Sequence, residues 1–79
     1  MKLRVKFTFP PKLVTEPVIW ELAHRYSVVT NIRGAEVGED FGWVMLEITG
    51  DNAAIEQGLT WVRSTGVRVD PVQGDVVEG

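Results

Sequence analysis

Few residues of this chain combine the type and spacing that catalysis or metal binding requires. The single histidine, His24, falls on the polar side of an expected helix, without the nucleophile and orienting acid that a triad needs. Glu36, Glu39 and Asp40 cluster at an expected turn, but calcium loops offer more oxygen ligands at regular spacing. A solvent-exposed histidine and a solvated turn are therefore the favoured interpretations. We predict no catalytic residues, no metal site, no cofactor and a protein that is not an enzyme.

Composition narrows the possible functions further. The 79 residues contain no cysteine, which excludes disulfides, thiolate zinc sites and iron–sulfur clusters. The net charge of −3 gives no general attraction to nucleic acids or anionic membranes. No apolar run approaches the ~20 residues that span a bilayer, and residues 1–12 lack the apolar region of a signal peptide. We predict a cytoplasmic domain with no nucleic-acid partner and no membrane partner.

Six segments show the periodicity of strands or helices. Residues 3–9 alternate apolar and polar side chains, as a strand with one buried face does, and two prolines end the pattern. A helix is expected over about 16–26, with Thr15 as its cap. The other predicted elements are strands at 28–37, 41–49 and 67–71 and a helix that has Asp51 as its N-cap and ends at Gly66. Gly58 lies inside this second helix, where we expect close packing against the first helix or the sheet.

The order strand, helix, strand, strand, helix, strand predicts an α+β ferredoxin-like fold. Right-handed crossovers then give a four-stranded antiparallel sheet in the order 4-1-3-2, with both helices on one face. This domain is expected to cover residues 1–72, since Pro71 stops the last strand, and residues 73–79 are predicted to be a flexible C-terminal tail. Because so short a chain lies near the lower size limit for independent folding, we expect a second copy or a partner to add burial.

The predicted sheet has one covered and one uncovered face. The residues expected to face the helices are Leu3, Val5, Phe7, Phe9, Val44, Leu46, Ile48, Val67 and Val69. The residues expected to face away are Arg4, Lys6, Thr8, Asn31, Arg33, Trp43, Met45, Glu47, Arg68 and Asp70. A tryptophan and a methionine among charged residues indicate a partner surface or a ligand platform. Trp43 and Met45 are therefore the predicted interface residues.

Four short pieces follow one another in an order that is typical of a known family. They are Asn31-Ile32-Arg33 in the second strand, Phe41-Gly42 after the turn, Gly50-Asp51 at the end of the third strand, and Gly66-Val67-Arg68-Val69-Asp70 at the last element. This order resembles the NIL domain, named for its Asn-Ile-Leu motif, over most of the chain. Two residues depart from the family pattern, because Arg33 replaces the motif leucine and Ala35 replaces the usual glycine.

The resemblance implies a regulatory domain. NIL domains occur at the C-terminus of the ATP-binding subunits of methionine importers, where they are similar to ACT domains, bind methionine and inhibit transport. They pair through their sheets and hold the amino acid at or near the interface. By position, the resemblance implies that Asn31, Ile32 and Arg33 bind methionine or a related amino acid. It also implies a homodimer, and a transporter or sulfur-metabolism protein as the regulated partner.

Other interpretations stay open from the sequence. Asn31 could instead bond to backbone at a strand irregularity. Arg33 could either alter a thioether pocket or clamp a carboxylate. The chain could also be a structural interaction module whose uncovered sheet or edge strand docks another protein without a small ligand. Single-stranded RNA binding usually needs two or three stacking aromatic rings on the open sheet, and this chain offers one there, Trp43.

Overall fold

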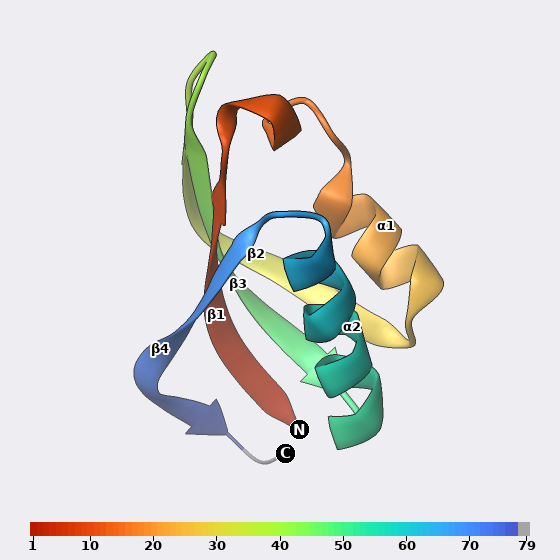
Figure 1. The fold of residues 1–79 in the computed structure, drawn as a ribbon. Coiled ribbons are helices and arrows are strands. Elements are labelled where there is room, and N and C mark those ends of the chain that lie inside the picture. The colour runs from red at the N-terminus through yellow and green to blue at the C-terminus, as the bar shows by residue number, and fades with distance from the viewer. Residues whose placement is uncertain (78–79) are drawn as a thin grey trace.

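The fold is a four-stranded sheet that two helices cover on one face (Figure 1). The computed structural model describes the backbone of residues 1–77 and the side chains of residues 1–72. Its elements are β1 (Lys2–Phe9), the 3-10 helix η1 (Pro11–Leu13), α1 (Val18–Arg25), β2 (Val28–Val37), β3 (Gly42–Gly50), α2 (Asn52–Ser64) and β4 (Arg68–Val77). Neighbouring strands pair antiparallel in the order β2-β3-β1-β4. The predicted α+β ferredoxin-like fold and its 4-1-3-2 strand order are confirmed.

Apolar residues that alternate along the strands meet the two helices in one core. The side chains of Phe7 in β1, Leu46 in β3 and Val62 in α2 are completely buried. Among the residues predicted to face the helices, those that are buried are Val5, Phe7, Phe9, Val44, Leu46, Ile48 and Val67. Leu3 and Val69 are partly buried and pack against the same core. The helix-facing side of the sheet is therefore the predicted one.

The helices pack closely at Gly58 of α2. A Cβ atom built at Gly58 would lie 2.7 Å from Cδ1 of Leu22 in α1, a distance at which one of the two groups must move. The predicted close packing at Gly58 is confirmed, and of the two alternatives, the first helix or the sheet, the neighbour is the first helix. Gly66 follows α2 with a φ of 104°, a left-handed conformation that favours glycine, as expected for a residue that ends a helix.

The start of α1 differs from the prediction. The helix begins at Val18, Pro17 occupies the N-cap position, and none of the described side chains caps the helix. The prediction that Thr15 caps a helix starting near residue 16 is wrong. The preceding chain instead forms η1 and a further turn, in which the amide of Glu16 donates a hydrogen bond to the carbonyl oxygen of Leu13 at 3.1 Å.

The last strand is longer than predicted. β4 continues past Pro71 to Val77, so the expectation that Pro71 stops it is wrong. Proline is tolerated here because β4 is an edge strand that pairs only with β1 in the described sheet, and because the register of the pair shifts between Leu3 and Val5, beside Pro71. The flexible tail over residues 73–79 stays a prediction, and residues 78–79 lie outside the described part of the chain.

Candidate functional site

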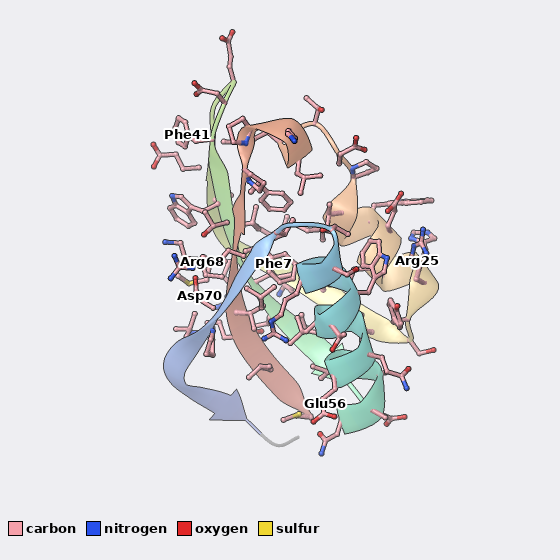
Figure 2. All side chains as sticks on the ribbon, in the orientation of Figure 1. Phe7, Arg25, Phe41, Glu56, Arg68 and Asp70 are labelled. Atoms are coloured by element: carbon pink, nitrogen blue, oxygen red, sulfur yellow. The ribbon has the colours of Figure 1, made fainter. Side chains whose placement is uncertain are left out.

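The face of the sheet away from the helices, called the open face below, is formed by alternate residues of all four strands. The strand register places on it Arg4, Lys6 and Thr8 of β1, Asn31, Gly34 and Glu36 of β2, Trp43, Met45 and Glu47 of β3, and Arg68 and Asp70 of β4. Figure 2 shows Arg68 and Asp70 on the side of the sheet opposite the helices. Because paired antiparallel residues share a face, the register confirms the predicted composition of the open face, apart from Arg33.

Charged residues of the open face are held against opposite charges or an aromatic ring. Nη2 of Arg4 donates a hydrogen bond to Oε2 of Glu47 at 2.8 Å. The Nζ atom of Lys6 lies 5.2 Å from the centroid of the Trp43 ring, within the range of a cation–π interaction. Solvent screens exposed pairs of this kind, so their contribution to the stability of the fold is small. They hold the side chains of Arg4, Lys6 and Glu47 in place on the open face.

Glu47 remains ionised in the middle of this charged group. The hydrogen bond from Arg4 lowers the pKa of the Glu47 carboxyl, partial burial opposes that effect, and the positive charges of Arg33 and Lys2 lower the pKa further. Glu47 in β3 is also the paired residue of Asn31 in β2. A carboxylate that can accept hydrogen bonds from an ammonium group therefore lies beside the first residue of the predicted ligand-binding motif.

The three predicted ligand-binding residues are consecutive in β2 but do not share a face. Asn31 pairs with Glu47 on the open face, whereas Ile32 pairs with the buried Leu46 and therefore points to the helix side. Arg33 lies at an irregularity, where the register of β2 and β3 shifts between residues 32 and 34. All three residues are exposed. The structure thus brings Asn31 onto the open face with the predicted interface residues Trp43 and Met45, and places Ile32 on the other side.

Large exposed apolar residues gather on β2 more than at the centre of the open face. Trp43 and Met45 are partly buried, whereas Val29, Ile32 and Val37 are 69%, 57% and 61% exposed. β2 is an edge strand, so one side of its backbone is not paired within the described sheet. Sequence reasoning assigned no role to Val29 or Val37. The sequence feature that could have indicated an exposed apolar residue in this strand is Val28-Val29, because two consecutive apolar residues interrupt the alternation of a half-buried strand.

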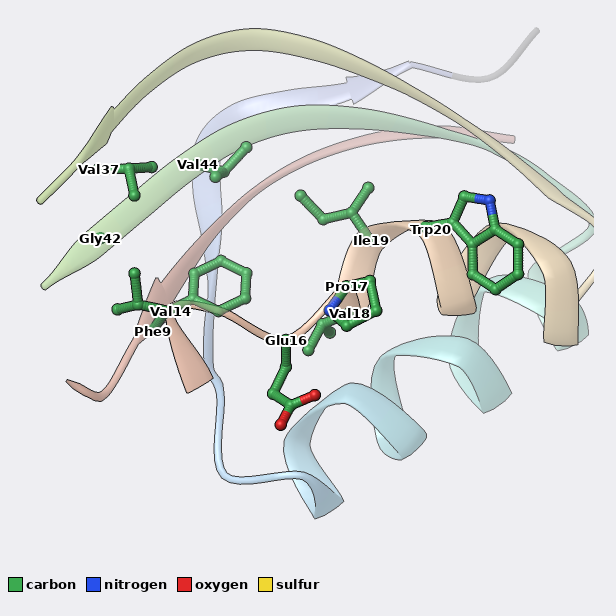
Figure 3. Close-up of a pocket in the computed structure, with 10 residues that line it drawn as sticks. All are labelled: Phe9, Val14, Glu16, Pro17, Val18, Ile19, Trp20, Val37, Gly42 and Val44. Atoms are coloured by element: carbon green, nitrogen blue, oxygen red, sulfur yellow. The ribbon is translucent and has the colours of Figure 1, made fainter. Parts of the chain in front are cut away.

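A cavity of about 210 Å³ lies between the start of α1 and the end of the β2–β3 hairpin (Figure 3). The residues that line it are Phe9, Val14, Glu16, Pro17, Val18, Ile19, Trp20, Val37, Gly42 and Val44. The predicted ligand-binding and interface residues do not contribute to it. Sequence reasoning missed this cavity because most of its lining residues have the apolar character and spacing of ordinary core positions.

Other kinds of site find no support within the part of the chain that the structure describes. Among the described residues, no three or more histidine, cysteine, aspartate or glutamate side chains gather in a way that could hold a metal ion. Over the same residues, neither helix has the length and apolar character needed to cross a membrane.

Comparison with known proteins identifies the family. The C-terminal domain of an ABC transporter ATP-binding protein from Enterococcus faecalis has a similar structure, with a TM-score of 0.79 and 16% identity over 92% of this chain and 86% of that chain. The de novo designed protein Ferredog-Diesel has a TM-score of 0.54 and 18% identity, over 92% of this chain and 85% of its own. At these identities the two structures show a shared fold. No curated protein matches the chain significantly. The NIL domain family model matches residues 3–71, and the chain therefore belongs to the NIL domain family.

Proposed function

We propose that this chain is a non-catalytic regulatory domain that binds methionine or a related amino acid at the interface of a homodimer. The observation that carries the proposal is the match of the NIL domain model to residues 3–71, which include the motif positions in β2. The Enterococcus faecalis domain belongs to a transporter ATP-binding protein, which supports a transporter subunit as the regulated partner. Within this proposal the domain works in the cytoplasm.

The chemistry of the open face supports a zwitterionic ligand. An amino acid needs hydrogen-bond donors for its carboxylate, acceptors for its ammonium group and an apolar contact for its side chain. The amide of Asn31 supplies a donor and an acceptor, and the guanidinium of Arg33 can pair with a carboxylate. The ionised carboxylate of Glu47 lies beside Asn31 and can accept from an ammonium group. Together these groups could hold the polar end of an amino acid at the β2 side of the open face.

The arrangement of the motif supports a dimer. Because Ile32 points to the helix side, Asn31 shares the open face with Trp43 and Met45 and not with Ile32. A second copy packed against the open face would cover Trp43 and Met45 and enclose a ligand that lies beside Asn31. The same contact would add the burial that a chain of 79 residues needs.

Methionine binding should depend on Asn31. In isothermal titration calorimetry, the wild-type protein is expected to bind methionine, and Asn31→Ala to bind it about tenfold more weakly, since the variant leaves a polar group of the ligand unpaired. Asn52→Ala is the matched control, because Asn52 is an exposed asparagine at the start of α2. An absence of binding heat at millimolar methionine, with the protein folded and dimeric, would contradict the proposal.

The dimer should depend on the open face. In analytical ultracentrifugation at micromolar concentration, the wild type is expected to sediment as a dimer and Met45→Lys as a monomer, because a lysine ammonium would lose its water at the interface. Thr60→Lys on α2 is the control, since Thr60 is exposed and lies on the helix layer. A wild-type protein that sediments as a monomer both with and without methionine would exclude this interface.

A second candidate function is a protein-interaction module without a small ligand. The observation that favours it is the exposed apolar surface of β2, an edge strand to which a partner strand can add. This function predicts no methionine binding, and it predicts one stoichiometric partner in a pull-down from the native host. Loss of that partner in a Val29→Lys variant would assign the contact to β2.

A further inference from the structure

The cavity beside α1 follows from the unequal lengths of the elements that enclose it. α1 has eight residues and is therefore about 12 Å long, whereas the ten residues of β2 span about 33 Å. A helix of that length cannot cover the whole strand. The hairpin end of β2 and β3 extends beyond α1, as Figure 1 shows. On the helix side of this end, Val44 is buried but Val37 is 61% exposed.

The walls of the cavity are mostly apolar. Phe9 and Val44 form a buried part of the wall, Ile19 of α1 is partly buried, and Val37 is 61% exposed. Figure 3 shows these four side chains around a common space, while the carboxylate of Glu16 points away from it. The cavity is open to solvent beside Val37 and Trp20, which are each 61% exposed. An apolar group that covers Phe9, Val44 and Ile19 there would remove apolar surface from water.

The volume limits what can enter. An engineered apolar cavity of about 150 Å³ in another protein stays dry and binds benzene, whereas pockets for drug-sized ligands measure about 300–1,000 Å³. At about 210 Å³, this cavity accommodates a single ring or a branched or thioether chain.

We propose that this cavity is a binding site for a compact uncharged apolar group of a small molecule, of the size of one aromatic ring or one aliphatic amino-acid side chain. The site lies on the helix side of the sheet and is separate from the Asn31 region of the open face. The group can belong to a neutral apolar molecule or to the side chain of an apolar amino acid. An amino acid would keep its ammonium and carboxylate groups in solvent outside the cavity, whereas a neutral apolar molecule has no such groups. This inference goes beyond the proposed function and does not require it.

The test uses toluene and methionine as probes and the methyl signals of the ¹³C-labelled protein as the readout. Toluene is expected to shift the methyl signals of Ile19, Val37 and Val44 saturably, and to leave those of Ile55 in α2 unchanged. If methionine shifts the same three residues, the apolar group is an amino-acid side chain; if only toluene does, the ligand is a neutral apolar molecule. The absence of a saturable shift at these residues with toluene would overturn the proposal.

Two matched variants test whether toluene binds in the cavity. Val37→Asp places a carboxylate in the wall and is expected to weaken toluene binding about tenfold or more. Val29→Asp is the control, because Val29 is an equally exposed valine of β2 whose pairing with Thr49 places it on the open face. Both positions are exposed, so both variants are expected to fold, which circular dichroism checks. Equal toluene affinity of the two variants would refute the site.

The result is independent of the methionine proposal. Methionine binding that disappears in Asn31→Ala but leaves the cavity methyl signals unmoved, with no toluene binding, would sustain the proposed function and overturn the cavity site. Toluene binding at the cavity in a protein that does not bind methionine would sustain the cavity site and overturn the proposed function.

Discussion

Phe7→Ala is expected to lower the free energy of unfolding by about 3–5 kcal/mol, the largest effect of any single truncation considered for this chain. Phe7 is completely buried and lies in β1, which pairs with both β3 and β4. Its ring also contacts that of Phe9 edge to face, with centroids 6.4 Å apart. Truncation removes these contacts and leaves a cavity that the paired strands cannot close, because their backbones are held by the sheet.

Because the domain is small, the stability lost in Phe7→Ala is large compared with its total stability. At roughly 0.05–0.15 kcal/mol per residue, a chain of this length has a total stability of about 4–12 kcal/mol, so the loss at Phe7 is a large fraction of it. Urea unfolding followed by circular dichroism measures the change. Phe41→Ala is the matched control, because Phe41 is 49% exposed beside the β2–β3 hairpin, and it is expected to cost about 1 kcal/mol or less. Similar losses for the two variants would mean that Phe7 is not a central core residue.

Gly58→Leu is expected to lower the free energy of unfolding by about 1–3 kcal/mol, because it overpacks the contact between the helices. Even a Cβ atom at Gly58 would lie 2.7 Å from Cδ1 of Leu22, and Leu22 is itself buried. A leucine side chain adds three further carbons in the same place. The helices must separate or Leu22 must leave its rotamer, and both changes disturb the core.

The matching alanine variant distinguishes the steric effect from helix propensity. Alanine is favoured over glycine inside a helix by about 1 kcal/mol, which offsets the contact with the flexible end of Leu22, so Gly58→Ala is expected to lie within about 1 kcal/mol of the wild type. Ala53→Leu, at an exposed position of the same helix, is expected to change stability by about 0.5 kcal/mol or less. Gly58→Leu as stable as the wild type in urea unfolding would show that the helices can move apart freely.

The single irregularity in the pairing of β2 with β3 has consequences for the proposed site. The register shift between residues 32 and 34 gives Arg33 a place outside the regular ladder. On one side of the shift Asn31 faces the open face, and on the other side Gly34 and Glu36 face it. Strand irregularities of this kind re-aim side chains, and they recur beside functional sites. In this chain the shift occurs at the position where arginine replaces the motif leucine.

Local patterns in the sequence predicted most of the fold correctly. The prediction of β2 as Val28–Val37 is confirmed, and the other strands are predicted to within a few residues, apart from the end of β4. The prediction for β4 failed because a proline rule that holds inside a sheet was applied to an edge strand with a register shift. The predicted start of α1 is wrong because the chain before Val18 forms η1 and a further turn, which leaves Thr15 outside the helix.

The candidate site was only partly predictable. The sequence placed Asn31, Trp43 and Met45 on one face, since strand alternation and sheet order are enough to assign them. The same alternation implies that Ile32 and Asn31 point to opposite faces, whereas the register shift at Arg33 is a property of the β2–β3 pairing that the sequence does not show.

By itself, the sequence determined the order of the elements, the ferredoxin-like topology, the covered face of the sheet and the membership of the NIL family, because each of these depends on local periodicity or on short motifs in order. Only the tertiary structure decided where the apolar cavity lies and where Arg33 falls outside the regular ladder. The cavity exists because a short α1 is laid across a longer β2, and the place of Arg33 depends on the register of β2 against β3. Both are relations between segments distant in the chain, which no local pattern encodes.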